Sequence, residues 1–457
     1  MPQGRPPLEL TMSKQTILSS GLLWTTIGSI ALVFLGAFES LAVTTIMPTI
    51  ARDLDGESLY SLAFSGTLAA SIIGMVVAGR LADQTGPAKP LVIAIAVFIV
   101  GLVFSGTALN MEVFVVGRVL QGLGNGAIIV SLYVVVGRLY PAVLHPKIFG
   151  AFAAAWVLPS LIGPPVAGVV ADVFSWHWVF LGVGVLVLIA GGAVIPALLQ
   201  LRSAPPIDGV AEDRSWWSVV WSVVVAVGIL AISLSGEIGA WWLAAVAFAA
   251  VVFALRPLVP KGTLTLRRGL PATILLRGLI AATFFASEIY LPYMLNVKFA
   301  LPTWLAGVIL TVGAVSWAAG SEVQGRIGAR MPHAAIARIG AVLLVIGIAT
   351  QFVTALLTLS PIVAAAGWFF AGGGMGLLFP RINTLVLGHS TERNQGFNSA
   401  AMSITDATGG ATAIAFAGLI FAAFGATTGM GFAAALGLTT VIALAAVPVA
   451  LRMREKA

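Results

Sequence analysis

Fourteen apolar runs follow one another along this chain, and each is long enough to cross a lipid bilayer. A helix of about 20 apolar residues spans the roughly 30 Å of hydrocarbon in a membrane. Because hydrocarbon offers no water to free backbone N–H and C=O groups, runs of this length are expected to be helical. The pattern predicts an all-α integral membrane protein with spans at residues 22–48, 60–82, 88–109, 111–138, 148–171, 176–200, 215–235, 239–257, 271–297, 303–325, 333–357, 361–387, 398–424 and 430–451.

The composition also indicates a membrane environment. Hydrophobic residues make up 59% of the 457 residues and charged residues 9%, and the mean hydropathy is +1.04. A soluble domain of this length could not remove so many apolar side chains from water. The absence of cysteine excludes disulfides and thiolate metal sites. The net charge of +7 is spread over short loops, which argues against nucleic acid as a partner. Residues 1–20 are polar and contain proline, so we expect no cleavable signal peptide.

The basic residues fall unevenly on the two sides of the predicted spans. Of the 24 Lys and Arg residues, all but four lie on the side that carries both termini. Arg52 and Lys298 lie on the other side, and Arg118 and Arg277 lie inside spans. Because basic loops stay cytoplasmic, we expect a multi-pass protein of the plasma (inner) membrane with both termini in the cytoplasm.

The runs divide the chain into three parts. Six spans precede the charged stretch 202–214, two spans follow it, and six more come after the basic linker 256–269. We therefore expect an N-terminal six-helix bundle at 1–200, a linker with two extra spans at 201–262, and a C-terminal six-helix bundle at 263–457. Paired six-helix halves with a site between them are typical of secondary transporters. We expect such a protein to act as a monomer.

Four motifs lie in runs where one transporter superfamily carries its signatures. They are "ESLAVTTIMP" (39–48) in the first run, "GRLADQTGPAK" (79–89) after the second, "GRVLQGLGNGA" (117–127) in the fourth and "LPSLIGPPVAG" (158–168) in the fifth. Together they resemble the major facilitator superfamily and, within it, the fourteen-span drug:proton antiporters. The first motif of that branch usually has Asp nine residues before its proline, where this chain has Glu39. The second usually continues with basic residues, where this chain has Pro87 and Ala88.

The resemblance implies a fold and several roles. It implies two pseudo-symmetric six-helix bundles, here with two inserted central helices. It implies that Asp83 locks the outward-facing state through contacts with neighbouring helix ends and that Arg118 takes part in proton transfer. Asp83 could instead be a solvated loop charge, and Arg118 could belong to a buried structural ion pair with Glu39 or a carbonyl. The predicted gating residues are Gly79, Asp83, Gly86, Gly163, Pro164 and Gly168.

Two of these gating features also have a physical interpretation. We expect Asp83 to sit at a helix N-terminus beside an arginine, where a carboxylate gains charge-assisted hydrogen bonds. Gly163, Pro164 and Pro165 would break a helix in water. Within a bundle the carbonyls that they free can be satisfied by neighbouring helices, so we expect a bend in the fifth span.

Glu39 is an acidic residue inside the first apolar run, where a charged side chain is unexpected. It lies nine residues before Pro48, or about 13 Å along a helix, which is close to the bilayer midplane. A charged carboxylate is expensive there, so we expect Glu39 to exchange its proton and to serve in proton coupling. The alternative is a structural acid hydrogen-bonded to a neighbouring helix.

Glu288 is a second candidate for proton coupling. It lies in the first span of the second half, the counterpart of the span of Glu39, and Tyr290 and Tyr293 follow it. An acid and aromatic rings together suit an amphipathic cation through charge and cation–π contact. A pair with Arg277 on the same helix is implausible, because about 16 Å separates the two positions.

Asp406 is the third acid inside a span. Gly409 and Gly410 follow it, so a neighbouring helix can approach closely at this point. Asp406 could pair across that contact or titrate, and the sequence does not favour either interpretation.

A substrate cavity is expected between the two halves. Its candidate lining residues are Phe38, Asn125, Trp156, Tyr290, Tyr293 and Met375. Plain packing is the alternative for Phe38, Asn125, Trp156 and Met375. The Trp residues that bunch in spans seven and eight are interpreted as an interfacial aromatic belt rather than as substrate contacts.

These features favour a proton-coupled antiporter that exports amphipathic small molecules, as in multidrug efflux, by alternating access. Its partners would be the bilayer, the substrate and protons, with no metal and no cofactor besides the coupling proton. Export of an endogenous lipid or glycolipid is an alternative within the same fold. An intramembrane acyltransferase is a third hypothesis, but the four His residues all lie near span ends, with no His–acid cluster inside the membrane.

Overall fold

The computed structural model describes residues 16–19, 22–141, 144–201, 216–236, 238–327, 331–390, 395–425 and 429–453. Within these ranges, fourteen helices are long and apolar enough to cross a membrane, and the elements are helices without a strand. The predicted all-α membrane class and the predicted number of spans are therefore confirmed.

The helices follow the apolar runs in order. The first six are α1 (Leu23–Asp53), α2 (Tyr60–Thr85), α3 (Ala88–Gly106), α4 (Met111–Leu139), α5 (His145–Val173) and α6 (His177–Leu201). Two more follow, α7 (Trp217–Ser235) and α8 (Trp241–Leu255). The last six are α9 (Leu270–Val297), α10 (Thr303–Ile327), α11 (His333–Leu357), α12 (Pro361–His389), α13 (Gln395–Phe424) and α14 (Met430–Ala450). Short 3₁₀ turns precede α2 (η3, Glu57–Leu59) and follow α8 (η5, Arg256–Leu258).

The first helix is longer than predicted. The sequence suggested an end at Pro48, whereas α1 continues to Asp53 with Pro48 inside it. A proline removes one backbone hydrogen bond, but the residues around it, Met47 and Ile50, are fully buried against neighbouring helices. That packing holds the helix together past the proline.

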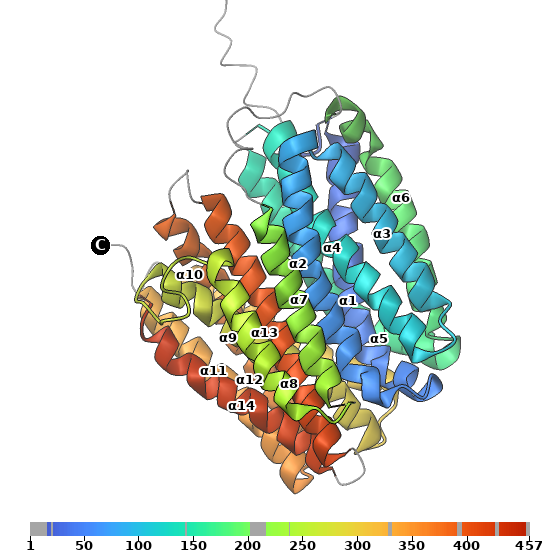
Figure 1. The fold of residues 1–457 in the computed structure, drawn as a ribbon, viewed down its shortest axis with the longest axis vertical. Coiled ribbons are helices and arrows are strands. Elements are labelled where there is room, and N and C mark those ends of the chain that lie inside the picture. The colour runs from blue at the N-terminus through green and yellow to red at the C-terminus, as the bar shows by residue number, and fades with distance from the viewer. Residues whose placement is uncertain are drawn as a thin grey trace, which may run out of the picture.

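Each half of the chain packs mainly on itself. In the first half, α4 packs against α2 and α3, and α1 packs against α5 and α6. In the second half, α12 packs against α10 and α11, and α9 packs against α13 and α14. Figure 1 shows the first six helices on one side of the molecule and the last six on the other. We call the end of the bundle where α1 begins the basic end, because Arg80, Lys89, Arg138 and Lys147 lie there, and the other end the opposite end.

The two halves meet along two seams. Helix α5 packs against α10, and α2 packs against α13. The Tyr60 hydroxyl at the start of α2 donates to the Ile289 carbonyl of α9 at 3.0 Å, and the Thr49 and Thr303 hydroxyls lie 3.2 Å apart. These contacts are at the opposite end of the bundle.

The α7–α8 hairpin covers the seam between α2 and α13. Helix α7 packs against α2, α8 and α13, and Figure 1 shows the hairpin in front of both seam helices. Ser65 of α2 and Ser233 of α7 are joined by a hydroxyl hydrogen bond of 2.8 Å. Toward the basic end, the Arg80 guanidinium lies 4.1 Å from the ring centre of Trp216. The division of the chain at residues 200 and 262 stays a prediction.

Four of the five tryptophans of the hairpin lie where an aromatic belt would place them, and the fifth, Trp221, packs on Phe253 within the hairpin. Trp216 and Trp217 are at the basic-end start of α7, and Trp241 and Trp242 are at the opposite-end start of α8. All four are exposed. Rings at both ends of a lipid-facing hairpin are typical of interfacial anchors.

Candidate functional site

Glycines bring the fourth helix close to its neighbours and so create the site. At Gly122 a Cβ would lie 2.1 Å from the Thr67 carbonyl of α2, and at Gly124 a Cβ would lie 2.6 Å from the Phe98 backbone of α3. Only glycine permits these approaches. The motif "GRVLQGLGNGA" therefore packs α4 against two helices at once and places its polar residues inside the first bundle.

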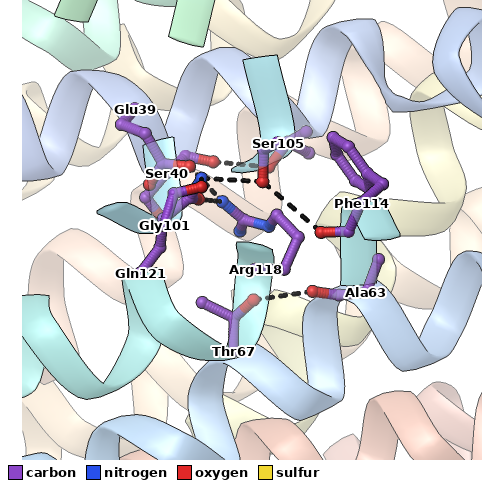
Figure 2. Close-up of polar contacts among 10 residues, drawn as sticks. Glu39, Ser40, Ala63, Thr67, Gly101, Ser105, Phe114, Arg118 and Gln121 are labelled. Carbon is purple, nitrogen blue, oxygen red and sulfur yellow. Dashed lines mark hydrogen bonds and ion pairs between the residues drawn. The ribbon is translucent and has the colours of Figure 1, made fainter. Parts of the chain in front are cut away.

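An ion pair between Glu39 and Arg118 lies inside that bundle. Glu39 is in the middle of α1 and Arg118 is about 10 Å, or seven residues, into α4 from the opposite end. An Arg118 Nη1–H donates to Glu39 Oε1, and both side chains are only 3% exposed. Figure 2 shows the two side chains among α1, α3 and α4. Glu39 is thus the partner that the intramembrane arginine was expected to need.

Gln121 links this pair to a third helix. The same Arg118 Nη1 donates to Gln121 Oε1, and the Gln121 amide donates to the Gly101 carbonyl at 3.1 Å and to Ser105 Oγ at 2.9 Å (Figure 2). The sequence analysis did not assign a role to Gln121 or Ser105. The position of Gln121, three residues after Arg118 on the same helix face, was the available signal.

The Glu39–Arg118 pair is stabilising only while Glu39 is negatively charged and Arg118 is positively charged. A buried guanidinium that loses its carboxylate is left with an uncompensated charge, and the Arg118 Nε–H already has no partner. Protonation of Glu39 would therefore weaken the link between α1 and α4. The geometry suits a group whose protonation is coupled to helix packing.

A second ion pair lies in the other half. Arg277 Nε donates to Asp406 Oδ1 at 2.6 Å, and Arg277 Nη1 donates to Asn383 Oδ1 at 3.2 Å. The guanidinium also lies 3.1 Å from the ring centre of Phe379. Asp406 thus pairs across a close helix contact, since a Cβ at Gly409 would lie 2.2 Å from the Gly278 carbonyl.

The two ion pairs lie toward different ends of the bundle and differ in exposure. Arg277 is seven residues, or about 10 Å, into α9 from the basic end, whereas Arg118 is the same distance from the opposite end. The side chain of Asp406 is 21% exposed, against 3% for Glu39. The structure therefore does not join the predicted proton-coupling residues into one cluster.

Glu288 stands apart from both pairs. It is half-buried on α9 and makes no hydrogen bond or ion pair with any residue in the described part of the chain. Phe284, one turn earlier, stacks on Trp368 with ring centres 4.4 Å apart and meets Trp317 edge-on at 5.2 Å. Glu288 thus lies one helical turn from an aromatic cluster and has no ion-pair partner among the described residues.

Tyr290 and Tyr293 lie in an aromatic cluster at the opposite end. Both are only 1% exposed, and Tyr293 stacks on Tyr60 of the other half with ring centres 4.4 Å apart. Phe421 of α13 packs against both tyrosines at 5.5 and 5.3 Å. In this conformation the two tyrosines seal the seam between the halves, and their role as substrate contacts stays a prediction.

The predicted gating residues of α5 pack against the other half. At Gly168 a Cβ would lie 2.7 Å from Trp304 Cα, and a Cβ at Gly307 of α10 would lie 2.7 Å from the Pro164 carbonyl. At Gly163 a Cβ would lie 3.5 Å from the Phe38 ring, an ordinary contact distance. Helix α5 continues through its prolines from His145 to Val173. The motif thus forms the contact between α5 and α10.

The loop motif after α2 requires one correction. Asp83 lies in the last turn of α2, so the expected helix N-terminus is wrong: the span that ends at this loop presents its carbonyl end. Gly86 caps the helix at φ +78°, a left-handed conformation that favours glycine, and Gly79 is buried within α2. The gating role of these residues stays a prediction.

The remaining cavity candidates divide into two groups. Phe38 and Asn125 are half-buried, and Trp156 is 40% exposed on the face of α5 that carries Gly163, seven residues later. Met375 is fully buried in the second bundle. The role of these four residues as cavity lining stays a prediction.

Two six-helix halves that meet along paired seams, with charged residues buried inside apolar helices long enough to cross a membrane, are typical of a membrane transporter rather than an enzyme. The family model for the Major Facilitator Superfamily matches residues 28–414. The chain belongs to the major facilitator superfamily.

Named relatives support the transporter class. The multidrug transporter protein MdtP of Bacillus subtilis (strain 168) is 27% identical over 413 residues, which cover 84% of this chain and 71% of the relative. Multidrug resistance protein 3 of the same organism is 23% identical over 328 residues, covering 69% of this chain and 63% of the relative, which is less than two thirds of its length. A solved POT family transporter in complex with a thioalcohol-conjugated peptide superposes with a TM-score of 0.69 over 94% of each chain at 15% identity. That likeness concerns the fold alone.

Proposed function

We propose that the chain is a proton-coupled antiporter of the plasma membrane that exports amphipathic small molecules, in the manner of multidrug efflux. The names of its relatives, which describe multidrug transport, support export as the direction. The clustering of basic residues at one end supports a cytoplasmic location for that end and for both termini. In this orientation the chain would move substrate from the basic end to the opposite end.

The Glu39–Arg118 pair is the observation that carries the proposal. A carboxylate at 3% exposure in the middle of a membrane helix is energetically costly, and ionisable residues in such positions are usually functional. Its partner is on a different helix, so the charge on Glu39 controls how α1 and α4 pack. A proton from the opposite side would neutralise Glu39, and release of that proton at the basic end would restore the pair.

The contacts between the halves support the direction of this cycle. Tyr60, Thr49 and the α5–α10 contact close the opposite end, while Tyr133 of α4, 50% exposed, lies toward the basic end. We infer a conformation that is open toward the cytoplasm, in which the proton leaves and the substrate binds. Rocking of the two halves would then expose Glu39 to the opposite side.

The environment of Glu288 favours cationic amphiphiles as substrates. An acid without a cationic partner, one helical turn from Phe284, can attract a positive charge, and the rings of the same region offer cation–π contact. Asp406 is neutralised by Arg277 and is less suited to bind a cation. We therefore assign substrate charge recognition to Glu288, and a part in proton release to Asp406.

The decisive test is gradient-driven uptake into inverted membrane vesicles. We expect Glu39→Gln to lower uptake of a fluorescent lipophilic cation by about tenfold or more, because a neutral amide cannot exchange a proton. The matched control is Glu322→Gln, which removes an exposed acid of α10 that pairs with Arg326 and should leave uptake within about twofold. Full uptake by Glu39→Gln would refute the proton role.

Export of a lipid remains the alternative for the substrate. The same vesicles can be loaded with labelled glycolipid in place of the cation. Gradient-driven glycolipid transfer without cation uptake would replace the proposed substrate class and leave the proton coupling in place.

A further inference from the structure

A pocket at the opposite end of the molecule joins the two halves. It has a volume of about 220 Å³. Its walls come from η3 and the start of α2 on one side and from α9 and α13 on the other. The lining residues used below are Glu57, Ser58, Ser61, Tyr60, Tyr290 and Phe421. The ion pairs described above contribute nothing to it.

Aromatic rings form the floor of this pocket. Tyr60 and Tyr290 have ring centres 6.1 Å apart, and those of Tyr290 and Phe421 are 5.5 Å apart. The face of an aromatic ring carries the negative part of its quadrupole. Such faces favour a positively charged and weakly hydrated group over an anion.

Oxygen atoms line the pocket beside the rings, and those of Glu57 and Ser58 belong to exposed residues. The side chains of Glu57, Ser58, Ser61 and Tyr290 make no hydrogen bond or ion pair with any other residue that the structure describes. Tyr290 is 1% exposed and lines the pocket, so a ligand in the pocket can reach part of this otherwise buried side chain. At Gly418 a Cβ would lie 2.0 Å from Ser61 Oγ, so a glycine is needed to keep this corner open.

The chemistry of the walls selects the ligand. One carboxylate and three neutral hydroxyls are too few anionic ligands for Ca²⁺ or Mg²⁺, which need several oxygen ligands in a defined geometry. One carboxylate above aromatic rings instead matches an organic ammonium ion, whose charge is diffuse and whose methyl groups pack on rings. The volume suits a small ion of this class.

We propose that this pocket binds a small organic ammonium ion from the opposite side of the membrane and thereby holds the opposite end closed. Glu57 supplies the countercharge, and Tyr60, Tyr290 and Phe421 supply the ring contacts. Because the ligand touches both halves, it stabilises the closed state over the open one. Binding does not depend on the proposed antiport, whereas the effect on the transport cycle rests on it.

Protection of a single cysteine tests the binding directly. The chain has no cysteine, so Ser58→Cys provides one reactive thiol at the pocket and Leu109→Cys, at a residue 91% exposed at the same end, provides the control. The full-length protein in lipid nanodiscs is labelled with a maleimide dye, with choline or its uncharged isostere 3,3-dimethylbutan-1-ol present. We expect choline alone to slow labelling at residue 58 by about fivefold and to leave residue 109 unaffected.

Two variants identify the groups responsible. Glu57→Gln and, separately, Phe421→Leu should each abolish most of the protection at residue 58, while labelling of Leu109→Cys in the same background confirms a folded protein. Equal protection by the uncharged isostere, or undiminished protection in Glu57→Gln, would overturn the site.

Turnover measurements separate the site from its effect on transport. Choline is added on the opposite side of vesicles that carry either the unmodified chain or Glu57→Gln, and substrate efflux is measured. We expect the choline-induced slowing of efflux to be about fivefold larger with the unmodified chain. Protection without this difference would reject the coupling to closure and retain the site. Failure of proton coupling would not alter the labelling result, because labelling uses no gradient.

Discussion

The Thr311 hydroxyl of α10 can donate to two carbonyls, that of Leu161 on α5, across the seam between the two halves, at 3.2 Å and that of Gly307 in its own helix at 3.1 Å. Leu161 is four residues before Pro165, and a proline cannot donate the helical hydrogen bond to that carbonyl. The other half of the molecule thus satisfies a carbonyl that the Pro-Pro sequence frees. A break in one helix becomes a contact that can form and separate as the halves move.

Removal of this hydroxyl should weaken the contact between the halves. Thr311→Val keeps the side-chain shape and leaves the Leu161 carbonyl without a donor, which costs about 1 kcal/mol. We expect a lower apparent Tm for the purified protein and easier opening at the opposite end, measured as faster labelling of a cysteine at position 304. Thr311→Ser retains the hydroxyl and serves as the control. If Thr311→Val behaves like Thr311→Ser in both measurements, the bond does not hold the seam.

The Glu39–Arg118 pair predicts a stability pattern separate from transport. Arg118→Leu leaves the Glu39 carboxylate buried without its cation, and breaking one partner of a buried pair costs about 3–5 kcal/mol. We expect a clear drop in apparent Tm. The double variant Glu39→Gln/Arg118→Leu removes both charges and should recover most of that loss while remaining inactive in gradient-driven uptake. A double variant as unstable as Arg118→Leu alone would show that the pair is not the source of the effect.

The membrane class and the number of spans could be predicted because they depend on the length and hydropathy of each run. Length and hydropathy define a membrane span without reference to any neighbour, and glycines spaced along α4 indicate a surface for close packing. An arginine inside hydrocarbon needs a partner, and the sequence offered Glu39 as one of two possibilities, the other being a carbonyl.

Contacts between distant segments could not be predicted in the same way. Arg277 and Asp406 are separated by 129 positions, and helical periodicity shows which face a residue occupies without showing which helix covers that face. The burial of Tyr290 and Tyr293 against Tyr60 depends on how the halves close, which is a property of the conformation. The error at Asp83 has a simpler cause, because the direction of its helix was available from the order of the spans.

The glycines of α4 predict a sharp contrast between two substitutions on one helix. At Gly122 a Cβ would lie 2.1 Å from the Thr67 carbonyl, whereas at Gly137 it would meet nothing within 4 Å. Gly122→Ala must separate α4 from α2 and should reduce the yield of folded protein and its apparent Tm. Gly137→Ala should be neutral or slightly stabilising, since alanine favours a helix by up to about 1 kcal/mol over glycine. Equal behaviour of the two variants in size-exclusion chromatography and thermal melts would contradict the close packing.

The α7–α8 hairpin should move with the first half and slide against the second. Ser233 and Trp216 attach it to α2 at two points along that helix. Its contact with α13 is apolar, and a Cβ at Gly236 would lie 2.8 Å from Leu419 Cδ1. Apolar contacts without hydrogen bonds can slide with little loss.

Two disulfides introduced into the cysteine-free chain distinguish moving from fixed contacts. Ser65→Cys/Ser233→Cys should form a bond between α2 and α7 and leave uptake within about twofold, because these helices move together. Gly236→Cys/Leu419→Cys should tie the hairpin to α13 and lower uptake by about tenfold until a reductant is added, because the seam beneath it can no longer open. Mass spectrometry establishes that each bond has formed. Normal uptake with the second bond intact would mean that the hairpin and α13 move as one body and that the hairpin belongs with the C-terminal half.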